Sequence, residues 1–231
     1  MNVLIVVSHP DDEVLGCGAT GAALAAAGRS VRACFLAGQA EARGGRPASG
    51  EFVADIEKAQ RELGFGPAIQ GSFPNIRLNT VPHIELVQFI ENAIEESQAQ
   101  VIFTHHPADL NDDHGQTARA CLAASRLFQR RANVKPLRRL CFMEILSSTD
   151  WSFPAAGASF QADTFVETGP WLDRKLAALR AYRGVMRPFP HPRSEEIVRA
   201  LAAYRGGQSG LQGAEAFQTV FAGSNVARDL F

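Results

Sequence analysis

The sequence lacks an excess of either charge and has no long apolar run. Its 23 Lys and Arg residues nearly balance 24 Asp and Glu residues, which leaves a formal net charge of −1. This balance removes the electrostatic reason to expect nucleic acid or an anionic membrane surface as a partner. No stretch approaches the roughly 18 to 20 apolar residues of a spanning helix, and acids interrupt the N-terminus at Asp11. We therefore expect neither a membrane span nor a secretory signal.

Cysteines are also few, and they stand far apart. No Cys-x-x-Cys pair occurs, and most of the cysteines lie in runs of apolar or small residues. This placement favours buried free thiols over disulfides, and it predicts a protein of a reducing compartment, the cytoplasm. The four positions are Cys17, Cys34, Cys121 and Cys141.

What the chain does contain is an alternation of short apolar runs with helical segments. Residues 3–7 and 101–104 are runs typical of strands buried on both faces of a parallel sheet. Residues 82–97 carry apolar side chains at helical spacing. At 231 residues, 46% of them apolar, the chain is long enough for one large domain. The alternation predicts a single α/β domain over residues 1–231, a three-layer α/β/α sandwich with a mainly parallel sheet.

Polar residues follow the first predicted strand directly. His9, Asp11, Asp12 and Glu13 lie within five positions, around a proline. In open α/β sheets, ligands bind beyond the carboxyl ends of the strands. Adjacent acids repel one another unless a cation neutralises them, and His nitrogens and Asp oxygens are normal zinc donors. The alternative is that Asp12 caps the following helix. Four such residues together favour a metal site over capping.

A second polar cluster follows the strand at residues 101–104. It begins with His105 and His106 and ends with His114 at a predicted helix start. A catalytic zinc takes three protein ligands and leaves one position for water, so we expect a third donor from this second strand end. A single histidine is usually structural, but two His/Asp clusters at two strand ends are harder to explain that way. His191 lies apart, in a proline-rich loop.

The stretch from Gly16 to Gly21 fits the pattern Gly-x-Gly-x-x-Gly of dinucleotide-binding proteins. In those proteins the first glycine follows the strand directly, so that the pyrophosphate meets a helix N-terminus. Here the predicted strand ends near Val7, and no acid ends the second strand to bind a ribose hydroxyl. We therefore disfavour a nucleotide-dependent oxidoreductase and expect these glycines to let the helix pack closely.

Two of these segments carry a family resemblance. His9-Pro-Asp-Asp-Glu13, followed by Asp113-His114, resembles the two signature motifs of the PIG-L/LmbE-like family of zinc-dependent N-acetylglucosaminyl deacetylases. The similarity continues through residues 73–80, 109–111, 147–151 and 190–194, and so covers the chain to about residue 220. The resemblance implies a Rossmann-like fold, one Zn²⁺ per chain and removal of an acetyl group from an amino sugar or its conjugate. It also implies a homo-oligomer, and a part after about residue 150 that completes the substrate site.

Carried over to this chain, the resemblance makes His9, Asp12 and His114 the zinc ligands and Asp11 the general base. His191 is our candidate for the donor that stabilises the oxyanion, with an ordinary loop histidine as the alternative. We expect Glu13 to orient His9 or a neighbouring backbone group.

Residues in the loops that edge the predicted site are candidates for binding the substrate, although an arginine in such a loop is more often an ordinary structural or surface residue. Asn111 stands where some family members have a histidine, and Asn79 where close relatives have an aspartate, so the departures concern substrate identity. Asp109 and Asn111 are also expected to brace the loop of His114. The substrate-binding candidates are Arg43, Arg77, Asn111 and Arg193.

Two other functions remain open. A zinc amidase acting on a non-sugar amide would need the same metal site. A non-catalytic metal- or sugar-binding protein on the same scaffold is disfavoured because Asp11, the base, is present.

Overall fold

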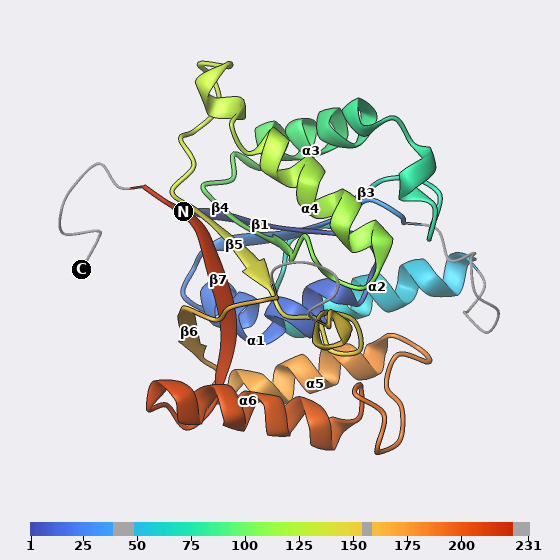
Figure 1. Cartoon of the computed structure of the whole chain (residues 1–231), viewed down its shortest axis with the longest axis vertical. Coiled ribbons are helices and arrows are strands. Elements are labelled where there is room, and N and C mark those ends of the chain that lie inside the picture. The colour runs from blue at the N-terminus through green and yellow to red at the C-terminus, as the bar shows by residue number, and fades with distance from the viewer. Residues whose placement is uncertain (39–48, 154–158, 224–231) are drawn as a thin grey trace.

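The strands form one sheet whose order places the first strand in its interior, beside the central strand. The structure, a computed structural model, describes residues 1–38, 49–153 and 159–223. Within these residues the sheet has seven strands in the order β3-β2-β1-β4-β5-β7-β6 (Figure 1). Strands β3 (Ile69–Gln70), β2 (Ser30–Phe35), β1 (Asn2–Val7), β4 (Val101–His105) and β5 (Arg139–Met143) run parallel. The predicted mainly parallel α/β sheet is confirmed.

Strand β1 is buried on both faces, as its unbroken apolar run predicts. Val3, Ile5 and Val7 point into one half of the core. Leu4 and Val6 point into the other half, because successive side chains of a strand alternate between the two faces of the sheet. Burial on both faces is the reason for a continuous apolar run in place of an alternating one.

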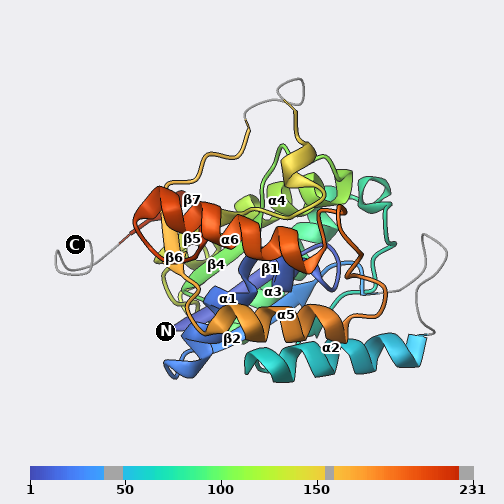
Figure 2. The same ribbon diagram turned by 90° about the horizontal axis from the view of Figure 1, so that it is seen from below.

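Helices cover both faces of the sheet and complete three layers (Figures 1 and 2). On one face lie α3 (His83–Ser97) and α4 (Asp112–Ala124), which pack on each other. On the other face lie α1 (Asp12–Ala26), α2 (Ser49–Leu63), α5 (Trp171–Ala181) and α6 (Glu195–Ser209). Three short 3-10 helices, η1 (Leu78–Thr80), η2 (Leu127–Gln129) and η3 (Thr149–Trp151), lie in the connections between these elements. Among the described residues, no helix is both long enough and apolar enough to cross a membrane.

The last strand pair departs from the parallel pattern. Strand β7 (Ala214–Ala222) runs antiparallel to β5 on one side and to β6 (Thr164–Glu167) on the other. Strand β7 is not among the elements that the sequence pattern predicts. Its buried half contains the acid Glu215 between two alanines, and an apolar strand pattern is therefore weak there.

The glycines between Gly16 and Gly21 are sites of close packing, as expected. A Cβ on Gly16 would lie 2.7 Å from Cδ1 of Ile145, and one on Gly21 would lie 2.3 Å from Cζ of Phe65. Both distances are too short for real side chains. These glycines therefore allow α1 to approach its neighbours and do not form a phosphate-binding turn.

All four cysteines are buried free thiols, which confirms the prediction. Burial raises the pKa of Cys121 to about 12 and that of Cys141 to about 11, and it also raises the pKa of Cys17 and Cys34. Because the thiolate is the reactive form, we expect the native protein not to react with a disulfide reagent such as DTNB at mildly alkaline pH. After denaturation all four thiols should react. Rapid reaction of any thiol in the native protein would contradict this burial.

Candidate metal centre

The two polar clusters meet at the carboxyl edge of the sheet. Strands β1 and β4 are parallel neighbours, so the residues that follow them leave the sheet side by side. This is also the point where the strand order reverses, since β2 lies on one side of β1 and β4 on the other. Open α/β sheets bind ligands at such a position. His9 and Asp12 come from the end of β1 and the start of α1, and His114 comes from the first turn of α4.

Three side chains converge there with the spacing of metal ligands. Oδ2 of Asp12 lies 3.3 Å from Nδ1 of His9 and 3.2 Å from Nε2 of His114. Two donors bound tetrahedrally to one zinc at 2.0–2.1 Å are roughly 3.3 Å apart. All three side chains are buried, and Nε2 of His114 has no hydrogen-bond partner among the described residues. A buried nitrogen that makes no hydrogen bond, this close to a carboxylate, fits a lone pair that points at a metal ion. The residues present therefore fit a divalent cation.

Each histidine is held from behind by a further carboxylate. Nε2 of His9 lies 3.0 Å from Oδ2 of Asp113, and Nδ1 of His114 lies 3.2 Å from Oδ2 of Asp109. Metal-bound histidines commonly donate their second ring N–H to a carboxylate, which sets the tautomer and aims the other nitrogen. Asp113 also accepts hydrogen bonds from the backbone N–H groups of Ile76 and Leu78.

Asp109 is the centre of a small hydrogen-bond network. Its Oδ2 accepts from the hydroxyls of Ser148 and Thr149 at 2.8 and 2.7 Å. Its Oδ1 accepts from the backbone N–H of Asn111 at 2.8 Å. The carboxylate therefore links the residues after β5 to the start of α4, which carries His114. These hydrogen bonds hold His114 in place.

The site favours positive charge at its centre. Burial lowers the pKa of His114, but attraction to Asp12 and hydrogen bonding to Asp109 outweigh it and raise this pKa to about 10. Burial likewise lowers the pKa of His9, and hydrogen bonds to Asp113 and Asp12 raise it above its ordinary value. Burial raises the pKa of Asp12, while the positive charge of His114 holds it well below the usual range. A divalent cation would replace the protons on these rings and satisfy the same carboxylates.

His105 supports this centre. His105, Asp109 and His114 are also close enough to hold a metal. However, Nε2 of His105 accepts a hydrogen bond from the backbone N–H of Ser8 at 2.9 Å, which places the proton of the neutral ring on Nδ1. Burial, with the positive charge of His114, lowers its pKa to about 3, so the ring stays neutral. It stacks on His114 with 3.8 Å between ring centroids. These contacts indicate that His105 supports the His114 ring and is not a ligand of a second metal ion.

Asp11 adopts a backbone conformation that side chains rarely take. Its φ is 116°, and it precedes α1 without capping the helix through its side chain. The backbone N–H of Asp11 donates to Oε2 of Glu13 at 3.0 Å. Glu13 in turn accepts from Tyr182 Oη at 2.6 Å and from Gln60 Nε2 at 2.8 Å. Strained backbone clusters at functional sites, where the surrounding structure holds it in place. Glu13 thus contacts the backbone of Asp11, and this contact is one of the two arrangements expected for it.

The loop that follows α5 brings a cation to Asp11. Nη1 of Arg193 lies 3.1 Å from Oδ2 of Asp11, and its Nε donates to the hydroxyl of Ser147 at 2.8 Å. His191 is exposed, and its Nδ1 accepts from the backbone N–H of Arg193 at 3.0 Å. The neutral ring of His191 therefore carries its proton on Nε2, which leaves that atom as a donor.

The remaining candidates lie in different surroundings. Asn111 caps α4, since its side-chain oxygen accepts from the backbone N–H of Asp113 at 3.1 Å. Arg77 is exposed, between the two residues whose backbone N–H groups bind Asp113. Arg43 lies outside the described residues. Their proposed contacts with a substrate stay predictions.

Several residues that shape the site were not assigned a role from the sequence. Asp113 was noted only as the neighbour of His114, and nothing in its position along the chain indicates that it holds His9. Gln60 lies in α2 and Tyr182 directly follows α5, both far along the chain from the motif. The run 147–151 that contains Ser148 and Thr149 is part of the family resemblance, and this was the one available signal for them.

The fold and the cluster together define an α/β protein with a potential metal site at the carboxyl edge of its sheet. The chain belongs to the PIG-L family, since residues 4–125 match the family described as "PIG-L: GlcNAc-PI de-N-acetylase". This stretch includes His9, Asp12 and His114. Membership in a deacetylase family indicates an enzyme that acts on amides. No curated protein matches the chain.

Solved structures extend the likeness over nearly the whole chain. The conserved protein TT1542 from Thermus thermophilus is 27% identical over 97% of both chains, with a TM-score of 0.78. N,N'-diacetylchitobiose deacetylase from Pyrococcus horikoshii is 17% identical over 95% of this chain and 83% of that one, with a TM-score of 0.74. The 4-carboxy-2-hydroxymuconate hydratase GalB from Pseudomonas putida is 19% identical over 98% and 99%, with a TM-score of 0.73. A deacetylase and a hydratase share this fold, so the reaction must be argued from the site.

Proposed function

We propose that this protein is a zinc-dependent N-deacetylase that hydrolyses the acetamide of an N-acetylated amino sugar or its conjugate. The observation that carries the proposal is the convergence of His9, Asp12 and His114 beside the strained Asp11. Family membership adds the reaction class, because PIG-L proteins are described as de-N-acetylases. The products would be acetate and a free amine.

His9, Asp12 and His114 would hold one Zn²⁺ per chain. Zinc bound there would polarise the acetamide carbonyl and lower the pKa of water from about 15.7 towards about 7. Asp109 and Asp113 keep the two imidazole rings aimed at a common point through their second nitrogens. Three protein ligands leave room for water and substrate, as in catalytic zinc sites.

Asp11 is the proposed general base. Its carboxylate takes a proton from the attacking water as the C–O bond forms, and it then delivers a proton to the departing nitrogen as the C–N bond breaks. Nη1 of Arg193 lies 3.1 Å from this carboxylate, so a positive charge stands beside the proposed base. Glu13, through the backbone N–H of Asp11, keeps the base in its unusual conformation.

His191 is the proposed donor to the oxyanion, since its Nε2 carries a proton and its loop also carries Arg193, which contacts the base. Substrate hydroxyls or other polar groups would be bound from the rim of the site. We propose Arg43, Arg77, Asn111 and Arg193 for this task, with Asn111 also capping α4 and Arg193 also paired with Asp11.

Acetate release tests the proposal directly. Purified protein is loaded with zinc, and its metal content is measured; we expect about one zinc per chain. It is then offered N-acetylated amino sugars, free and conjugated, beside acylated amines that carry no sugar. Acetate from the sugars alone supports the proposal, and acetate from the simple amides alone identifies an amidase of another kind. Metal binding without turnover of any amide would instead indicate a binding protein or, as the hydratase with this fold illustrates, a different reaction.

A further inference from the structure

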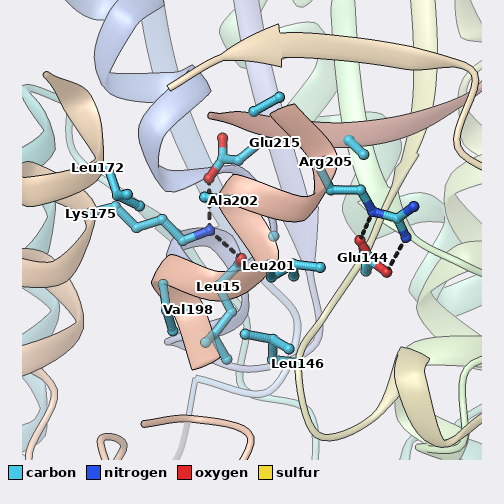
Figure 3. Close-up of a pocket in the computed structure, with 13 residues that line it drawn as sticks. Leu15, Glu144, Leu146, Leu172, Lys175, Val198, Leu201, Ala202, Arg205 and Glu215 are labelled. Atoms are coloured by element: carbon cyan, nitrogen blue, oxygen red, sulfur yellow. Dashed lines mark hydrogen bonds and ion pairs between the residues drawn. The ribbon is translucent and has the colours of Figure 1, made fainter. Parts of the chain in front are cut away.

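A buried ion pair lies between α1, α5 and β7. Nζ of Lys175 lies 2.8 Å from Oε1 of Glu215, and both side chains are only 6% exposed (Figure 3). Beside the pair is a cavity of about 20 Å³, lined mostly by apolar side chains such as Leu146 and Leu172. A space of this size holds about one water molecule. The burial of both side chains limits how much bulk solvent screens the pair.

The pair makes three hydrogen bonds to backbone groups of α1. Lys175 Nζ donates to the carbonyl oxygen of Leu15 at 2.7 Å, and Glu215 Oε1 accepts from the backbone N–H of Ala19 at 3.0 Å. These two backbone groups are four residues apart, and a regular α-helix joins such groups to each other. Oε2 of Glu215 also accepts from the backbone N–H of Thr20 at 2.6 Å. The ion pair therefore spans one turn in the middle of α1.

The glycines of α1 make room for this contact. A Cβ on Gly18 would lie 3.1 Å from Cγ of Lys175, so a larger residue there would press on the lysine stem. One glycine of the segment that resembles a nucleotide-binding loop therefore leaves the space in which the Lys175 side chain reaches the backbone of α1.

Stability alone is a weak reason for such a pair. Taking two charges out of water costs about as much as their attraction returns, and well-packed apolar residues of similar size often stabilise a protein equally well. Buried ion pairs can instead specify one arrangement of the surrounding structure. The arrangement at stake here is the start of α1.

Leu15 connects the pair to the proposed base. Its carbonyl accepts from Lys175, while its own backbone N–H donates to the carbonyl oxygen of Asp11 at 2.9 Å. Val14 donates to the same oxygen at 3.1 Å. Asp12, the proposed ligand, is the first residue of α1. One helical turn therefore separates the ion pair from both Asp11 and Asp12.

We propose that Lys175 and Glu215 are positioning residues, which fix the first turns of α1 and with them Asp11 and Asp12. The statement that these residues position a base and a metal ligand rests on the proposed function. The statement that they fix the first turns of α1 does not, and it can be tested without metal. Residues from α5 and β7, outside the matched family segment, would thereby set the geometry of a site built from residues inside it.

The test replaces both charges by apolar residues of similar size, in Lys175→Met/Glu215→Leu. The matched control is Arg205→Met/Glu144→Leu, which removes an ion pair at the same cavity that makes no hydrogen bond to α1 among the described residues (Figure 3). Melting temperature shows whether each variant is folded. Hydrogen exchange of the Val14 and Leu15 amides is measured without metal, and Co²⁺ affinity and the visible spectrum of the Co²⁺ protein report on the ligand geometry.

We expect the first double variant to melt within a few degrees of the wild type. Its Val14 and Leu15 amides should exchange at least about tenfold faster, and its Co²⁺ affinity should fall at least about tenfold with an altered spectrum. The control should match the wild type in all three. Unchanged exchange with an unchanged spectrum would overturn the inference. If the wild type binds no Co²⁺, the proposed function fails, and the exchange rates alone decide the inference. Should the double variant not fold, Glu215→Gln, which keeps an oxygen acceptor but loses the charge, is judged by the same measurements.

Discussion

Replacing Asp11 by Asn is expected to leave zinc bound and to reduce acetate release by about 10²- to 10⁴-fold. The amide has the size of the carboxylate, and Asn tolerates positive φ better than most residues, so the backbone at 116° should be kept. What the variant loses is the ability to take a proton from water. Zinc content, kcat and KM are measured together, because a lost base lowers kcat without a matching rise in KM.

Asp112→Asn is the matched control for this variant. Asp112 is an exposed acid in the first turn of α4, and its Oδ1 accepts from Nε2 of Gln116 at 3.4 Å. We expect it to retain nearly full activity, with the same zinc content. Full activity of Asp11→Asn would refute Asp11 as the base, and loss of zinc in that variant would mean that Asp11 contributes to metal binding.

His114→Ala is expected to remove zinc from the protein, because only two of the three proposed ligands would remain. The side chain is almost fully buried, with its Nε2 3.2 Å from Oδ2 of Asp12. His9→Ala should behave in the same way. Asp109→Asn keeps the ligand but loses the negative charge and one acceptor oxygen behind it, so we expect a smaller effect, about 10- to 100-fold in zinc affinity.

The zinc affinities of these variants are compared by measuring zinc content after dialysis and by competition with a chelator. His83→Ala serves as the control, since His83 is exposed at the start of α3 on the surface. It should bind zinc like the wild type. If zinc stays in both His9→Ala and His114→Ala, the ligand assignment is wrong, and the metal must be bound by other residues.

Much of the site could be predicted because its residues are close together in the sequence. Five positions hold His9, Asp11, Asp12 and Glu13, and a strand that is apolar on both faces precedes them. Burial on both faces identifies a central strand, and the carboxyl end of such a strand is where ligands bind. The same reasoning applied to residues 101–114 predicts a second group at the same edge.

Other contacts could not be predicted because they join residues with no common pattern. Asp113 holds His9 across 104 positions, and Tyr182 reaches Glu13 across 169. A tyrosine at the end of a helix has the same sequence pattern whether its hydroxyl donates to water or to a carboxylate. The position of Arg193 is similar, since a loop arginine at the rim and one paired with the base have the same sequence signature.

The sequence by itself therefore determined the α/β class, the mainly parallel sheet and the two segments that carry the proposed ligands, because periodicity and adjacency are local properties. Only the tertiary structure decided where β7 pairs, which carboxylate stands behind each histidine and why a lysine and a glutamate are buried together. Glu215 interrupts the apolar pattern of β7, so the sequence offers no reason to bury this residue. In the structure Lys175 and the backbone of α1 are its partners. A buried charge is tolerated only with its partners in place, and those partners come from distant parts of the chain.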